Sequence, residues 1–320
     1  MPQRGKIATL DPNPVSVTAP LPPRPLPVRD GVAPSYAWLP AGDWPDLLSY
    51  LVTRFPHIGE AVLLGRFARG ELVSDCGRAL SPHEPYRAGT RIWYYRDVPT
   101  EMVVPFDEVV LYRDERLLVV DKPHFLSTIP AGRYLRETLL TRLRHKLDLP
   151  DLTPVHRLDR ETAGVVVFCL HPPSRGAYQT LFERREVSKT YEAVAPWSTE
   201  LALPLTHRSR LEEGDDFFTM GEVEGEPNSE TRVDVIRHGG TLALYRLEPH
   251  TGKKHQLRVH MAALGIPILH DPWYPSFTEK KEDFSRPLQL LARSIAFVDP
   301  ISGRAREFSS QRQLAWAEPL

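Results

Sequence analysis

The residues best suited to joint chemistry lie in the stretch PVHRLDRETAGVVVF, residues 154–168. Its first half crowds ionisable side chains into a short loop, from His156 to Glu161. Its second half, residues 165–168, is a β-branched and apolar run that predicts a buried strand. Gly164 lies between the halves. A glycine here indicates that another part of the backbone approaches so closely that a Cβ would clash. A carboxylate fixed between arginines at the start of a strand suits a reactive acid, although a solvated charged turn is the commoner meaning of such a pattern.

A second polar stretch begins with HTGKKHQLRVH at residues 250–260 and raises the question of a metal centre, because histidines stand at positions 250, 255, 260 and 270. In a strand, His255 and His260 would point to opposite faces, and no cysteine joins them, so the spacing argues against a metal site. Serine-hydrolase chemistry lacks a nucleophile elbow here, and a kinase interpretation of HRLD lacks the glycine-rich loop. We therefore expect no metal.

Three motifs together resemble the RluA-type family of RNA pseudouridine synthases. HRLDRETAG resembles the family's signature loop, whose catalytic Asp falls on Asp159. KTYEA resembles its Lys-x-Tyr-x-Ala segment, whose Tyr falls on Tyr191. HTGKKHQLRVH resembles its Arg-Thr-Gly-Arg-x-His-Gln-Ile-Arg-Val-His motif, whose Asp-pairing arginine falls on Arg258. The resemblance implies that these three residues are catalytic and that six others contact the substrate: Arg157, His156, His255, Gln256, Leu257 and Lys189.

The sequence departs from the family pattern at other positions. His250 and Lys253 stand where arginine is usual, and His270 and Pro275 stand where glycine is usual. FVDP replaces a Phe-x-His-Pro segment near the end. These differences bear on which RNA is modified and leave the three catalytic positions untouched.

The resemblance implies an enzyme that isomerises particular uridines in structured ribosomal or transfer RNA to pseudouridine, without a cofactor. A stacked uridine must turn out of the helix, at a cost of roughly a few kcal/mol, and the family arginine that matches Arg157 fills the vacated space. Asp159 then attacks the nucleoside or assists departure of uracil, while Arg258 pairs with Asp159. Tyr191 holds the base and is a candidate proton acceptor. The alternative is a catalytically inactive RNA-binding protein with the same fold.

The composition is that of an ordinary soluble globular protein. The 320 residues are 41% hydrophobic and 25% charged, with a formal net charge of −1 and two cysteines. So few cysteines suit a reducing compartment, and the first residues lack the apolar region of a signal peptide. No apolar run is long enough to span a bilayer. We expect a cytoplasmic monomer that binds RNA through a local basic groove and binds neither DNA nor a membrane.

The chain divides into three predicted parts. Residues 1–34 are rich in proline and predict a tail without regular structure. Residues 35–104 predict a small α/β accessory domain, for which RNA binding and plain packing are alternative roles. Residues 105–320 predict the catalytic domain. The predicted fold class is α+β, a pseudouridine-synthase-like mixed, largely antiparallel sheet with flanking helices.

Several basic residues have two interpretations at this stage. Periodicity places Arg66 and Arg69 on the exposed side of a helix, and the outward face of a second helix, residues 133–147, holds three more arginines: Arg136, Arg142 and Arg144. These faces either follow a phosphate backbone or are simply solvated. Lys122, at the end of a predicted strand, either contacts RNA or caps the strand.

Overall fold

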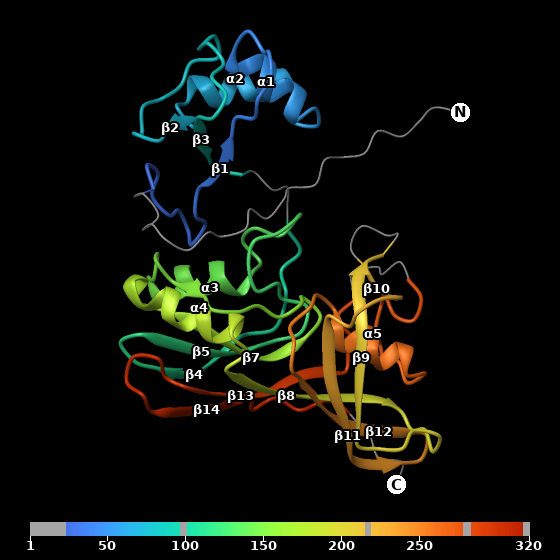
Figure 1. Cartoon of the computed structure of the whole chain (residues 1–320). Helices are drawn as coiled ribbons and strands as arrows, with labels where there is room; N and C mark the ends of the chain where they lie inside the picture. Colours follow the sequence, from blue (N-terminus) through green and yellow to red (C-terminus); the bar gives the residue numbers. More distant parts are fainter. Residues whose placement is uncertain (1–23, 97–100, 215–218, 278–282, 316–320) are drawn as a thin grey trace, which may run out of the picture.

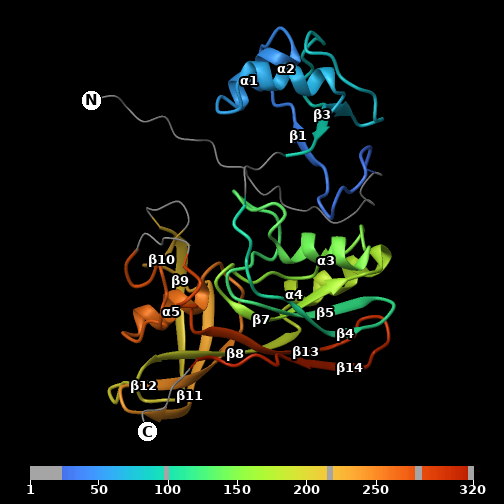
Figure 2. The same ribbon diagram turned by 180° about the vertical axis from the view of Figure 1, so that it is seen from behind.

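Two bodies of unequal size make up the protein (Figures 1 and 2). The computed structural model describes residues 24–96, 101–214, 219–277 and 283–315. Most of the predicted tail, residues 1–23, lies outside these ranges. Among the described residues, no helix combines the length and the apolar character that crossing a bilayer requires.

The small body packs two helices on one face of a three-stranded antiparallel sheet. Its elements are β1 (Ser35–Trp38), α1 (Leu47–Arg54), α2 (Glu60–Ala68), β2 (Val73–Ser74) and β3 (Arg91–Tyr94), with strand order β1-β3-β2. The Asp46 side chain begins α1 by accepting a hydrogen bond from the Ser49 amide. The predicted exposure of Arg66 is wrong, because this side chain is buried and donates to the Tyr95 carbonyl.

The large body is built on an eleven-stranded, largely antiparallel sheet. In order, its strands are β4 (Val109–Arg113), β5 (Leu117–Lys122), β6 (Thr153–Pro154), β7 (Ala163–Cys169), β8 (Val187–Pro196), β9 (Leu205–Glu213), β10 (Met220–Val223), β11 (Ser229–Gly239), β12 (Leu242–Pro249), β13 (Leu290–Val298) and β14 (Ala305–Ser309). The strand order is β10-β9-β11-β12-β8-β13-β7-β5-β4, with β14 beside β13 and β6 beside β7. Only the β13–β7 pair is parallel among the described strands.

Among the described residues, four helices accompany this sheet: α3 (Leu139–Leu147), the short 3₁₀ helix η1 (Pro172–Ser174), α4 (Arg175–Glu183) and α5 (Gln256–Ala263). Strand β5 is buried on both sides. Leu118 and Val120 pack with α3, whereas Leu117 and Val119 pack with α4. A strand covered on both faces needs apolar residues at every position, which explains the continuous apolar runs of β5 and β7.

Gly164 joins the two central strands as its sequence position predicts. Its φ is +115°, and a Cβ there would lie 2.2 Å from the Ala292 carbonyl oxygen. Gly164 and Ala292 are register partners in the parallel β7–β13 pair. Glycine is therefore required for these strands to meet, and this junction fixes the end of the charged loop.

The helix α3 is shorter than its periodicity predicts. It begins at Leu139, after Thr138 caps it, because the Glu101 carboxylate binds the backbone amides of the three residues before the cap. The predicted outward face is wrong for two of its three arginines. Arg144 is buried and donates to the Leu152 carbonyl, and Arg142 binds Glu137. Arg136 is exposed as predicted, but it precedes the helix.

The segment after β12 is a helix, where a strand was expected. Helix α5 packs Leu257 and Met261 against β8, β11 and β12. All of residues 256–261 are buried, so the segment shows no amphipathic pattern of the kind by which a surface helix is recognised. The argument that placed His255 and His260 on opposite faces of a strand therefore fails.

Candidate active site

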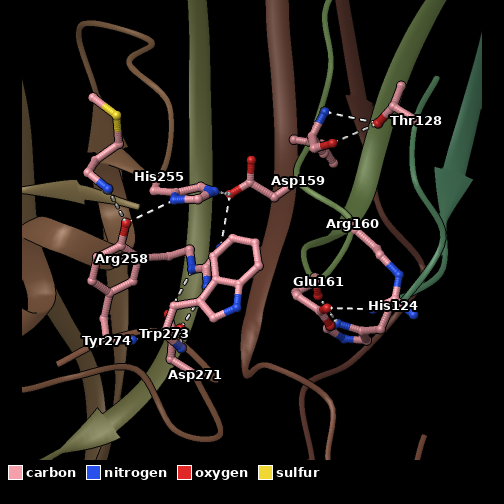
Figure 3. A network of polar contacts seen from close by, with 12 residues as sticks. His124, Thr128, Asp159, Arg160, Glu161, His255, Arg258, Asp271, Trp273 and Tyr274 are labelled. Atoms are coloured by element: carbon pink, nitrogen blue, oxygen red, sulfur yellow. Dashed lines mark hydrogen bonds and ion pairs between the residues drawn. The ribbon is translucent and has the colours of Figure 1, made fainter. Parts of the chain in front are cut away.

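The charged loop after β6 is held at its backbone on both sides of Asp159 (Figure 3). The Thr128 hydroxyl donates to the Leu158 carbonyl at 2.8 Å and accepts from the Leu158 amide at 3.1 Å. The Thr162 amide donates back to the Asp159 carbonyl at 3.2 Å. These contacts fix the position of Asp159 without using its carboxylate.

The following residues of the loop are held by two basic side chains. Lys122 is fully buried, and its ammonium donates to three backbone carbonyls, including that of Arg160 at 3.2 Å. The His124 ring lies 2.7 Å from the Glu161 carbonyl. Of the two roles left open for Lys122, the structure supports the internal one, because its donors bind the protein.

Arg258 lies beneath Asp159 and binds two carboxylates. Its Nε and Nη2 each donate to Asp271 at 2.7 Å, and its Nη1 donates to Oδ2 of Asp159 at 3.4 Å. The guanidinium lies 4.7 Å from the Trp273 ring centre and 5.2 Å from that of Tyr274. The predicted pairing of Arg258 with Asp159 is present, but it is the longer of the two contacts.

His255 approaches the same oxygen of Asp159 from another side. Its Nε2 lies 3.8 Å from Oδ2, and its Nδ1 lies 2.8 Å from the Tyr274 hydroxyl. That hydroxyl accepts from the Met220 amide, and its own proton has no other acceptor among the described residues. Tyr274 therefore donates to Nδ1, which places the proton of a neutral imidazole on Nε2, facing Asp159. Burial lowers the pKa of His255 to about 4, so the ring is neutral at pH 7.

The two oxygens of the Asp159 carboxylate are therefore unlike. Both Arg258 and His255 contact Oδ2, whereas Oδ1 has no hydrogen-bond partner within the described parts of the chain. The side chain is 32% exposed. A carboxylate anchored by one oxygen presents the other to a substrate.

A cavity of about 450 Å³ opens beside Asp159. Its size lies in the range of small-molecule sites in proteins. The cavity brings together all nine residues to which the resemblance gives a catalytic or substrate-contacting role: Asp159, Tyr191, Arg258, Arg157, His156, His255, Gln256, Leu257 and Lys189. Tyr191 packs against the apolar clusters of both halves of the sheet, so the cavity lies at the boundary between these halves.

Tyr191 is held as a neutral phenol. Burial, followed by the negative charge of Asp159, raises the pKa of its hydroxyl well above the ordinary value. A phenol of raised pKa is a poor proton acceptor at neutral pH. The environment therefore favours a packing role for Tyr191 over a role as base.

Three of the predicted substrate-contacting side chains remain available to a ligand. Arg157 is exposed, and no ion pair or hydrogen bond holds its guanidinium in the described structure. Lys189 lines the cavity and donates a long hydrogen bond to the Thr251 carbonyl, at 3.4 Å. The apolar side chain of Leu257 also reaches the wall. These residues remain suitable for RNA contact.

Two other predicted contacts are used by the protein itself. His156 accepts a hydrogen bond from the Val167 amide at Nε2 and stacks on Phe182. The Gln256 amide makes four hydrogen bonds: it donates to Glu230 and Thr231 and accepts from Thr251 and Lys253. That number exhausts an amide's capacity, so Gln256 shapes the cavity and has no hydrogen bond to offer a substrate.

One group in the described structure has metal-ligand composition. His207, Glu222 and His260 present ligand atoms within 4.8 Å of one another. However, the Ser229 hydroxyl donates to the Ser209 carbonyl and so accepts from Nε2 of His260. As hydrogen-bonded here, His260 carries its proton on Nε2 and has no lone pair there for a metal.

Sequence reasoning missed Asp271 and Tyr274, which orient the site from behind. Both follow α5 closely, but the family motif ends before them. Asp271 is the only carboxylate that binds two nitrogens of Arg258 in the described structure. A buried arginine requires a buried counter-charge, and this requirement was the available signal.

Comparison with known proteins points to one family. A family model described as RNA pseudouridylate synthase matches residues 116–263. The dual-specificity RNA pseudouridine synthase RluA of Yersinia pestis is 34% identical over 213 residues, which cover 64% of this chain and 99% of that protein. The protein of the same name from Haemophilus influenzae is 33% identical over 218 residues, covering 63% and 92%.

A solved structure resembles the fold as well. Human RNA pseudouridylate synthase domain containing 1 superposes with a TM-score of 0.54 at 25% identity, over 67% of this chain and 86% of that chain. The predicted α+β class, with its mixed and largely antiparallel sheet, is confirmed.

Proposed function

The chain belongs to the RluA-type family of RNA pseudouridine synthases, and from this premise we propose that it modifies particular uridines of ribosomal or transfer RNA, with Asp159 as the reacting group. The observation that carries the proposal is the unlike bonding of the Asp159 oxygens. Arg258 and His255 hold Oδ2, and Oδ1 is available beside a cavity of suitable size.

The isomerisation balances without a co-reactant. The bond from C1′ of the ribose to N1 of uracil breaks, the base rotates, and a bond from C1′ to C5 forms. C5 loses a proton and N1 gains one. The carboxylate of Asp159 either adds to the nucleoside or stabilises the sugar as uracil departs, and both routes need an ionised acid next to the ribose. Arg258 supplies fixed positive charge for that acid.

The cavity walls have separate tasks in this proposal. Tyr191, as a neutral phenol, packs against the rotating base and does not start the proton transfer. Leu257 closes the apolar side. Arg157, exposed and without a protein partner among the described residues, enters the RNA helix where the uridine has turned out. Lys189 is placed to meet a phosphate of the flipped nucleotide.

The RNA class is tested by mapping pseudouridine in cellular RNA. Ribosomal and transfer RNA from a strain lacking the gene are compared with RNA from the parent strain, and purified protein is added back to the deficient RNA. We expect one site or a small set of sites to disappear and to return on addition. If both RNA classes keep all their pseudouridines, the substrate proposal is wrong.

A further inference from the structure

Within the described parts of the chain, one face of the small sheet has no helix over it. The core beneath α1 and α2 takes Ala37 from β1 and Ile92 and Tyr94 from β3. Because side chains alternate along a strand, Tyr36 and Trp38 point to the opposite face. In both overall views the strands lie between these helices and the large body, so this open face is on the side of the catalytic domain (Figures 1 and 2).

The open face is aromatic and is organised around one arginine. Tyr36 stands opposite Trp93 across the strand pair, and Trp38 stands opposite Arg91. The Arg91 guanidinium lies 4.7 Å from the ring centre of Trp93, 5.1 Å from that of Trp38 and 5.2 Å from that of Tyr36. Asp75 accepts from both Arg91 and the Trp93 indole at 2.7 Å. We call Tyr36, Trp38, Arg91 and Trp93 the aromatic face.

The outer rings of the aromatic face are available to a ligand. Trp93 is buried beneath its neighbours, but Tyr36 is 45% exposed and Trp38 is 48% exposed. Two large rings fixed side by side on a strand, at this exposure, differ from isolated surface apolar residues. Since Arg91 packs against both rings and Trp93 packs against Tyr36, little ordering is needed before they bind.

We propose that the aromatic face binds unpaired RNA bases, which stack on Tyr36 and Trp38. This inference rests on the proposed function, because it takes RNA as the partner. Bases stack on aromatic rings regardless of sequence, and Tyr36 and Trp38 present two such rings at the surface. The arginines of α2 are a weaker alternative. Arg66 is buried and Arg69 is paired with Glu71.

The test measures binding of the full-length protein to a fluorescently labelled oligoadenylate of about eight nucleotides. This RNA contains no uridine, so its binding does not depend on catalysis. Four variants are compared with the wild type: Tyr36→Ala, Trp38→Ala, Trp38→Phe and Leu64→Ala. The last removes an exposed apolar side chain from α2, on the other side of the same domain.

We expect Tyr36→Ala and Trp38→Ala each to weaken binding by roughly tenfold or more, with Trp38→Phe and Leu64→Ala close to the wild type. Unchanged binding in both alanine variants would overturn the proposal, as would an equal loss in Leu64→Ala. A proline-rich peptide of residues 20–27 is tested in the same way. If the peptide binds and Trp38→Ala weakens its binding, whereas oligoadenylate binding does not depend on Trp38, the aromatic face binds a protein segment and the proposal is wrong. If the wild-type protein binds oligoadenylate through the aromatic face but isomerises no uridine, the proposed function is refuted and this inference stands.

Discussion

Arg258 binds Asp271 more closely than it binds Asp159. Two guanidinium nitrogens lie 2.7 Å from the Asp271 oxygens, whereas the nearest oxygen of Asp159 is 3.4 Å away. The Asp271 side chain has no exposure, and that of Asp159 is 32% exposed. The buried charge of Arg258 is therefore balanced mainly by Asp271, and the more exposed Asp159 keeps its Oδ1 available to a substrate.

Removing Arg258 alone, and then Arg258 together with Asp271, should affect stability and activity differently. Arg258→Met leaves the Asp271 charge buried without its counter-charge, which should lower the free energy of unfolding by about 3–5 kcal/mol. The double variant Arg258→Met/Asp271→Asn should regain much of that loss while activity stays low, because Asp159 still lacks its positive neighbour. Urea unfolding and turnover assays on the same preparations measure both quantities.

The exposed pair Arg210–Glu212 supplies the control for this experiment, since Glu212→Gln should change the unfolding free energy by less than about 1 kcal/mol. Recovery of activity in the double variant would show that Arg258 acts only through stability.

The hydroxyl of Tyr274 should matter for turnover through His255. Tyr274→Phe removes the donor to Nδ1, so the imidazole proton no longer has to point at Asp159. We expect kcat to fall roughly tenfold with little change in KM. Tyr245→Phe is the matched control, because it deletes a hydroxyl that donates to the Pro196 carbonyl, away from the cavity. Equal kcat in the two variants would contradict the positioning role.

The buried His260 should make the protein sensitive to acid. Burial lowers the pKa of His260 from 6.5 to about 4. Between these values the unfolded chain binds a proton that the folded chain does not, so stability is present above about pH 6.5 and is lost as the pH falls toward 4. His260→Gln should reduce the slope of unfolding free energy against pH by about 1.4 kcal/mol per unit in this window.

His250→Gln, on an exposed side chain, is the comparison for that slope. Parallel pH profiles for wild type and His260→Gln would rule out the neutral buried imidazole.

Gly164→Ala should disrupt the junction behind the catalytic loop. The added Cβ would meet the Ala292 backbone at 2.2 Å, with φ at +115°, so we expect a loss of about 3 kcal/mol or more and a parallel loss of turnover. Gly176→Ala lies in α4 with open space around it and should be neutral or stabilising by about 0.5–1 kcal/mol. Thermal unfolding measures the stability of both variants. Equal changes in Gly164→Ala and Gly176→Ala would refute the argument that Gly164 is required for the close approach to Ala292.

The sequence predicts strands and loops well where one local pattern dominates. The apolar run of β7 and the glycine near its start both lie where the pattern places them. Helix α5 was missed because Leu257, Val259 and Met261 alternate as in a strand. The segment is buried on all sides, so periodicity carried no information about its conformation.

In the site as well, the sequence predicts residues that belong to a local motif and misses those defined by distant contacts. Asp159, Tyr191 and Arg258 were found through motif resemblance, and the cavity unites them. Asp271 was missed, and Arg66 and Arg144 were misplaced, because a buried charge is defined by partners distant in the chain or on the backbone. Arg144, for example, donates to the Leu152 carbonyl, and the sequence of its own helix does not predict that contact.

The central claim is that Asp159 reacts with uridine, and release of the C5 proton tests it most directly. RNA from a strain lacking the gene, tritiated at C5 of its uridines, is incubated with the wild type and with Asp159→Asn. The near-isosteric change should keep the fold and RNA binding but abolish tritium release, while the wild type releases tritium to completion at its sites. Release by Asp159→Asn at the wild-type rate would contradict the account. No release by the wild type from any cellular RNA, with RNA binding intact, would indicate a protein that binds RNA without modifying it.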